Sequence, residues 1–159
     1  MSESLLQLAD ELTAALTEFS KVQQIIQDAN ERIGEPPPDT FEMYALGGIL
    51  HDLYHGMEGI CLRVVKQIDQ REPIGTSWHR DLIDSVSRPV PNLRPAVISK
   101  ETADLLEQYR GFRHHFRHNY GFELSWPKLA PLWRDAPTMI EKFIQDIEQF
   151  ISFLKMMSS

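Results

Sequence analysis

Residues 40–70 read T-F-E-M-Y-A-L-G-G-I-L-H-D-L-Y-H-G-M-E-G-I-C-L-R-V-V-K-Q-I-D-Q and decide the fold. Apolar side chains recur every three or four positions and form a broad band from Tyr44 to Ile68, which predicts a long, deeply buried helix. Asp39 or Thr40 can cap its N-terminus. A glycine inside a helix costs up to about 1 kcal/mol relative to alanine. The glycines of this stretch therefore predict close helix or subunit packing; they are Gly47, Gly48, Gly56 and Gly59.

A second amphipathic pattern precedes this stretch. Apolar residues at helical spacing run from Leu5 to Ile33, with Glu, Gln, Asp and Lys between them. Gly34 and the prolines at positions 36–38 cannot continue a helix. The pattern predicts one helix from Leu5 to Ile33, followed by a stiff connection.

A proline-rich connector follows, over residues 71–100. It holds S-W-H-R-D-L-I-D at Ser77–Asp84, which predicts a short capped helix. Trp78 and Leu82 are the side chains expected to anchor this connector on the protein. A connector of this length inside a compact domain is often functional or packed on the surface.

A third helix is predicted after the connector, capped by Ser99 and ending near Tyr120 and Gly121. A short loop with Trp126 and two prolines is expected next. The last helix is predicted from Leu132 or Ala136 to Met156, because apolar residues there share one helix face.

No segment of the chain has the pattern of a strand, so the predicted fold class is all-α. We expect one domain over residues 1–159, an up-and-down four-helix bundle with an extra short helix in the connector between helices 2 and 3.

The composition is typical of a globular protein, with 42% hydrophobic and 25% charged residues. No apolar run approaches the roughly 20 residues of a membrane helix, and the start M-S-E-S lacks the shape of a secretory signal. The single cysteine, Cys61, suits a reducing compartment. These features predict a cytoplasmic protein without a membrane partner. The net charge of −7 argues against a protein that coats nucleic acid indiscriminately.

The third helix ends in a strongly basic stretch. Residues 109–120 read Y-R-G-F-R-H-H-F-R-H-N-Y and contain no acidic residue. Arginine offers a planar fork of donors that matches phosphate, and histidine titrates near neutrality. Arg113 and His118 could therefore orient a phosphodiester and move a proton, which suffices to cleave RNA without a metal. A basic face that is only solvated is the structural alternative, because charged helix faces are common.

The spacing of this pair has a geometric consequence. Side chains five positions apart on a regular helix diverge by about 140° around its axis. Arg113 and His118 could meet if the helix loosens near Gly121, or if two copies of the helix face each other across a two-fold axis.

Two histidine pairs support a different chemistry. His51 and His55, and likewise His114 and His118, are four positions apart and so share a helix face. Such pairs on two helices could hold one transition metal, with oxygen ligands from Asp52 and Glu58. The alternative is that His51 and His55 are polar-face or interface residues.

The basic stretch resembles a known motif. Residues 113–120, R-H-H-F-R-H-N-Y, fit the R-x4-H-x-Y pattern of HepT-type HEPN toxins, with His114 as the polar residue after the arginine. The wider order of S-W-H-R-D-L-I-D, R-P-A-V-I-S, the motif and G-F-E-L-S-W resembles HepT-like ribonuclease toxins over most of the chain.

This resemblance implies a HEPN-type bundle that forms a homodimer and acts as a metal-independent endoribonuclease, with RNA as substrate and no cofactor. Arg113 and His118 would be the catalytic pair, supported by His114. Arg110 and Arg117 are the residues expected to bind RNA.

The resemblance also implies a partner, a nucleotidyltransferase antitoxin of the MNT type that attaches AMP to the motif tyrosine. Tyr120 holds that position. A bulky anion there would repel the substrate phosphate. Some HEPN domains only bind or dimerise, so a non-catalytic module remains the alternative beside a histidine-rich metal-binding bundle.

Overall fold

The computed structural model of the chain describes residues 2–118 and 124–159, with all of their side chains except those of Arg117 and His118. The described residues are mostly helical and contain no strand. The helices are α1 (Ser2–Ser20), α2 (Val22–Ile33), α3 (Thr40–Gln67), α4 (Trp78–Val86), α5 (Lys100–His118) and α6 (Trp126–Ser158). The predicted all-α bundle, with a short helix in the connector between the second and third long segments, is confirmed.

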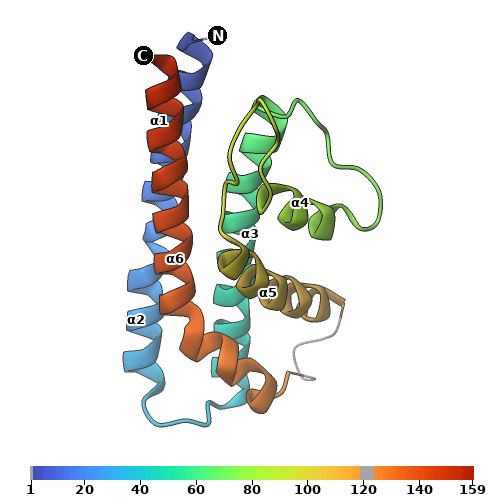
Figure 1. Ribbon diagram of the computed structural model, residues 1–159. Helices are drawn as coiled ribbons and strands as arrows, with labels where there is room; N and C mark the ends of the chain where they lie inside the picture. The colour runs from blue at the N-terminus through green and yellow to red at the C-terminus, as the bar shows by residue number, and fades with distance from the viewer. Residues whose placement is uncertain (1, 119–123) are drawn as a thin grey trace.

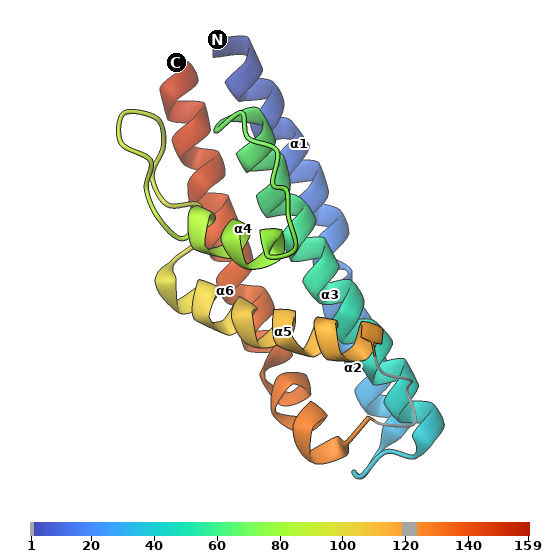
Figure 2. The same ribbon diagram turned by 90° about the vertical axis from the view of Figure 1, so that its right-hand side faces the viewer.

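The long helices define the shape of the molecule. Figure 1 shows α1 and α6 side by side, α2 continuing the line of α1, and α3 next to them. The shorter helices α4 and α5 lie across one side of α3, as both Figure 1 and Figure 2 show. None of the described helices combines the length and the apolar character needed to span a bilayer.

Helix α3 is the central element, as its broad apolar band predicts. Its side chains at Leu50, Tyr54, Met57 and Val64 are fully buried. Asp39 caps its N-terminus in a capping box: the Asp39 carboxylate accepts from the Glu42 N–H, and the Glu42 carboxylate accepts from the Asp39 N–H.

Two of the α3 glycines explain how neighbours come close. A Cβ added at Gly47 would lie 2.9 Å from Phe116 Cε2 of α5, and one added at Gly56 would lie 3.0 Å from Phe19 Cδ2 of α1. The predicted close packing is therefore confirmed for these two. Gly48 and Gly59 have no described atom within 4 Å of such a Cβ.

Two boundary predictions and one burial prediction were wrong in detail. The first predicted helix is interrupted at Lys21, where the chain makes a turn between α1 and α2. The α3 helix ends at Gln67, and Gln70 adopts a positive φ of 51°. Tyr44, expected in the apolar band, is 44% exposed because it lies near the open N-terminal end of α3.

The start of the last helix was also predicted wrongly, because α6 begins at Trp126 and contains Pro131 and Pro137. Pro127 stands in the first turn, where the missing N–H removes no helical bond. The two later prolines lie inside the helix, and the first part of α6 bends away from the rest in Figures 1 and 2. Proline within a helix is the usual cause of such a bend.

The connector is fastened to the bundle at several points. Leu82 is 1% exposed and Trp78 packs against the core, so both predicted anchors are confirmed. Arg94 is buried and forms a bidentate ion pair with Asp69, with Nε to Oδ1 at 2.6 Å and Nη2 to Oδ2 at 2.7 Å. Its guanidinium also donates to the backbone carbonyl of Arg88.

Candidate functional site

The basic stretch lies in the second half of α5, and the first half of this helix is fixed firmly. The predicted cap is confirmed, since the Ser99 hydroxyl accepts from the Thr102 N–H at 3.1 Å. The buried Tyr109 hydroxyl donates to the Leu132 carbonyl of α6 at 2.8 Å. These contacts set the direction in which α5 projects toward the middle of α3.

Aromatic packing then holds the second half of α5 against α3. The rings of Phe112 and Phe116 stack with centroids 5.8 Å apart. Phe116 in turn covers Gly47 and lies 5.8 Å from the His51 ring. Phe116 of the basic helix thus packs against α3.

Arg113 points inward from this helix. Its guanidinium carbon lies 5.9 Å from the centroid of the Tyr54 ring, within the range of a cation–π interaction. The Arg113 Nε atom is buried and has no hydrogen-bond partner among the described residues. Arg113 is therefore a cation held against an aromatic side chain of α3 rather than a side chain extended into solvent.

Tyr54 is a part of the site that the sequence did not reveal. It is fully buried, and its hydroxyl has no hydrogen-bond partner within the described part of the chain. Burial, followed by the negative charge of Glu58, raises its pKa far above the ordinary value for tyrosine. The sequence analysis placed Tyr54 in the apolar band of α3. A tyrosine hydroxyl within such an apolar band was the only sequence feature that could have indicated its role.

Arg110, predicted to bind RNA, is engaged by an acidic neighbour. Its Nε donates to Glu107 Oε1 at 2.6 Å, and Arg80 of α4 approaches the same oxygen at 3.8 Å. The hydrogen bond that Arg110 donates to Glu107 raises the pKa of Arg110. Arg110 would have to exchange this carboxylate for a phosphate in order to bind RNA.

The remaining motif residues are only partly described. His114 lies exposed on α5, and His118 is the last residue of the helix. The side chains of Arg117 and His118, and the whole of Tyr120, lie outside the described residues. The predicted meeting of Arg113 with His118, and the role of Tyr120, stay predictions.

The residues proposed as metal ligands make other contacts where the structure describes them. The rings of His51 and His55 stack 6.4 Å apart, and Glu58 is paired with His79 Nδ1 of α4. Within the described residues, no group of three or more histidine, cysteine, aspartate or glutamate side chains is suited to hold a metal ion. The set that includes His118 extends beyond those residues.

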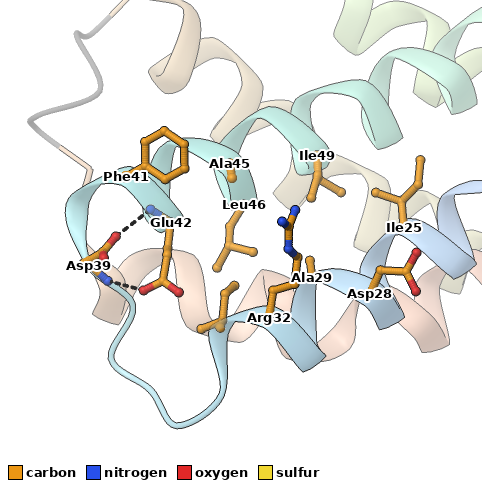
Figure 3. Close-up of a pocket in the computed structure, with 11 residues that line it drawn as sticks. Ile25, Asp28, Ala29, Arg32, Asp39, Phe41, Glu42, Ala45, Leu46 and Ile49 are labelled. Carbon is orange, nitrogen blue, oxygen red and sulfur yellow. Dashed lines mark hydrogen bonds between the residues drawn. The ribbon is translucent and has the colours of Figure 1, made fainter.

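A groove of about 610 Å³ lies elsewhere, between α2 and the first turns of α3. Figure 3 shows Arg32 reaching across it, Ala29 and Leu46 along it, and the Asp39–Glu42 capping box at one end. Phe41 on its rim is 83% exposed. Of residues 109–116, whose side chains the structure describes, none lines this groove.

Comparison with known proteins assigns the family. A family model described as "HepT-like protein" matches residues 45–154, well over half of the chain. The chain belongs to the HepT-like family. The matched part of this HepT-like chain includes Tyr54, Glu58, His79 and the whole of α5, whereas α1, α2 and the start of α3 lie outside it. No curated protein and no solved structure shows a significant match to the HepT-like chain.

Proposed function

We propose that this HepT-like chain is the toxin of a toxin–antitoxin pair and a metal-independent endoribonuclease. The observation that carries the proposal is Arg113 itself, an arginine of the R-x4-H-x-Y motif that is packed against Tyr54 in the family-matched part of the chain. A cation held in one position before substrate arrives is the kind of group that stabilises charge in a transition state.

The chemistry assigned to the motif needs a phosphate ligand and proton transfer. Arg113 binds the scissile phosphate through its Nη groups, while the 2′-hydroxyl oxygen attacks phosphorus and the bond to the 5′-oxygen breaks. His118 carries the proton between the two oxygens, and His114 supports the phosphate contact. The products are a 2′,3′-cyclic phosphate and a 5′-hydroxyl, so no oxidant or metal is required.

A second copy of the chain completes the site in this proposal. Arg113 and His118 diverge by about 140° on a regular helix, so the histidine of one protomer can face the arginine of the other. Arg110 and Arg117 contact the RNA backbone beside this cleft. Size measurement by sedimentation tests the dimer, and a monomer that cleaves RNA contradicts it.

Control by an antitoxin follows from the motif tyrosine. A nucleotidyltransferase of the MNT type adds AMP to Tyr120, which places a phosphate two residues beyond His118. The added anion occupies the cleft and repels the substrate phosphate. Co-expression with such an enzyme should add about 329 Da per AMP to the intact mass, and Tyr120→Phe should abolish the addition.

The catalytic assignment is tested by RNA cleavage in excess EDTA. Activity is expected in the wild type and lost in folded Arg113→Ala and His118→Ala. Exposed His55, on α3 rather than on the motif helix, provides the control variant His55→Ala. Full activity of folded His118→Ala contradicts the assignment.

The second candidate is a HEPN module that binds without cleaving. It is favoured by the pairing of Arg110 with Glu107, which leaves less free positive charge on α5. It predicts a stable complex with a nucleotidyltransferase and no cleavage of any RNA in a complex pool.

A further inference from the structure

Glu58 is a buried carboxylate with an assigned partner but no assigned role. It is 5% exposed, in the middle of α3. Its Oε2 atom contacts Nδ1 of His79, whose side chain is 21% exposed and whose ring stacks on Trp78 at 3.6 Å. A buried charge is destabilising unless it is paired, and His79 provides the partner that the buried Glu58 carboxylate needs.

Glu58 also lies next to the support of Arg113. Tyr54 and Glu58 are four residues apart, so they share a face of α3 and are separated by about 6 Å along its axis. The phenol of Tyr54 is influenced by the charges of both Glu58 and Arg113. Arg113 stands over the Tyr54 ring. The Tyr54 side chain therefore lies between the Arg113 guanidinium, which reaches it from α5, and Glu58, one turn further along α3.

Among the described residues, no hydrogen bond from the Arg113 Nε atom explains why this side chain points inward. Its Nε atom and the Tyr54 hydroxyl are both buried there without partners. Among the described residues, the Tyr54 ring lies against this guanidinium, and the Glu58 carboxylate stands one helical turn from Tyr54. Charges interact more strongly in such a buried setting than in water.

We propose that Glu58 is a positioning residue for Arg113 and that His79, supplied by the connector helix α4, keeps the Glu58 carboxylate in place. The inference rests on the proposed function, because it assigns these residues to the same site. In this proposal the segment Ser77–Asp84 supports the catalytic site through His79, in addition to covering the core. Misplacing a catalytic group by a small distance lowers the rate even when the fold persists.

The first experiment measures RNA cleavage by Glu58→Gln, which removes the charge and keeps the shape. We expect kcat to fall by about tenfold or more, with KM for the RNA unchanged within about twofold. In an Arg113→Lys background the same change should lower kcat by less than about twofold, because the fork to be positioned is gone. Asp52→Asn, at an 85% exposed acid of the same helix, is the matched control and should behave as wild type. An equal loss in both backgrounds overturns the inference.

A pair of His79 variants keeps the test decisive if Glu58→Gln fails to fold. In His79→Asn the amide nitrogen can replace Nδ1 and still donate to Glu58, so kcat should stay within about threefold of wild type. His79→Leu removes the donor, and kcat should fall by about tenfold or more. Equal activity of the two folded variants overturns the role of His79.

A stability measurement separates this inference from the proposed function. Thermal midpoints are compared for wild type, Glu58→Gln, Arg113→Met and the double variant, without RNA. If the wild type cleaves no RNA, the proposed function fails, but the coupling between Glu58 and Arg113 is still tested. The inference expects the Glu58→Gln shift to differ between the two backgrounds. Additive shifts overturn it.

Discussion

The guanidinium of Arg94 is fully buried and is clasped by the carboxylate of Asp69, with two hydrogen bonds of 2.6 and 2.7 Å. The pair joins the connector to the end of α3. Removing one member leaves the other as an uncompensated buried charge, which typically costs about 3–5 kcal/mol. Arg94→Met and Asp69→Asn should each lower the free energy of unfolding by about that amount. Urea titration measures it, and a loss below about 1 kcal/mol would contradict a buried pair.

The Tyr54 hydroxyl is expected to be dispensable and its ring essential. The buried hydroxyl makes no well-formed hydrogen bond among the described residues and is influenced by Glu58, so Tyr54→Phe should change the free energy of unfolding by no more than about 1 kcal/mol. The ring under Arg113 persists in that variant, so RNA cleavage should continue. Tyr54→Leu removes the ring and should lower cleavage by about tenfold or more. Calorimetry and initial rates decide, and equal rates for the two variants would contradict the support of Arg113 by the ring.

Gly47 and Gly48 should respond oppositely to alanine. A Cβ at Gly48 has no described atom within 4 Å, so Gly48→Ala should raise stability by up to about 1 kcal/mol through helix propensity. A Cβ at Gly47 would lie 2.9 Å from Phe116 and must displace its ring. Gly47→Ala should therefore lower both the thermal midpoint and RNA cleavage. Similar midpoints for the two variants would argue against close packing of α5 on α3.

The Cys61 thiol predicts an alkaline loss of stability. Burial first, and the charge of Glu58 second, raise its pKa from 9.0 to about 12. Because the folded pKa lies above the unfolded one, this contribution to stability is complete below pH 9 and is lost as the pH rises toward 12. Burial raises the pKa values of Tyr54 and Tyr109 in the same direction. In Cys61→Ala the thermal midpoint should decline less steeply from about pH 8 to about pH 10 than in wild type. Identical slopes would contradict a protonated buried thiol.

Glu107 is expected to limit RNA affinity by occupying Arg110. Glu107→Gln should free the guanidinium and tighten the binding of short single-stranded RNA by about threefold, with a steeper salt dependence. Arg110→Ala should weaken binding in the same assay. Fluorescence anisotropy in a His118→Ala background avoids cleavage during the measurement. No change on Glu107→Gln would mean that Arg110 takes no part in RNA binding.

The sequence predicted most of the helical framework, because helix periodicity and capping are local properties. Asp39 and Ser99 cap the helices for which they were proposed. The boundary at Trp126 was missed, because prolines usually end a helix and α6 accommodates Pro131 and Pro137 by bending. The break at Lys21 could not be predicted in this way, because no proline or glycine stands there.

The candidate site was less accessible from the sequence than the fold. Arg113 was identified through its motif, yet its position over Tyr54 depends on how α5 crosses α3. The contact between Glu58 and His79 joins segments separated by a turn and a connector, so no local spacing encodes it. Long-range contacts of this kind are set by packing, which periodicity does not specify.

The bend in α6 has a mechanical consequence. Pro137 has no N–H to donate to the Trp133 carbonyl one turn earlier, so this carbonyl lacks its usual partner within the helix. The Tyr109 hydroxyl donates to the carbonyl of the preceding residue, Leu132. The bend thus divides α6 into a short arm before Pro137 and a long arm after it. The short arm is bonded to the motif helix through Leu132, and α6 also packs against α1. The course of the short arm therefore fixes where the Leu132 carbonyl meets the motif helix.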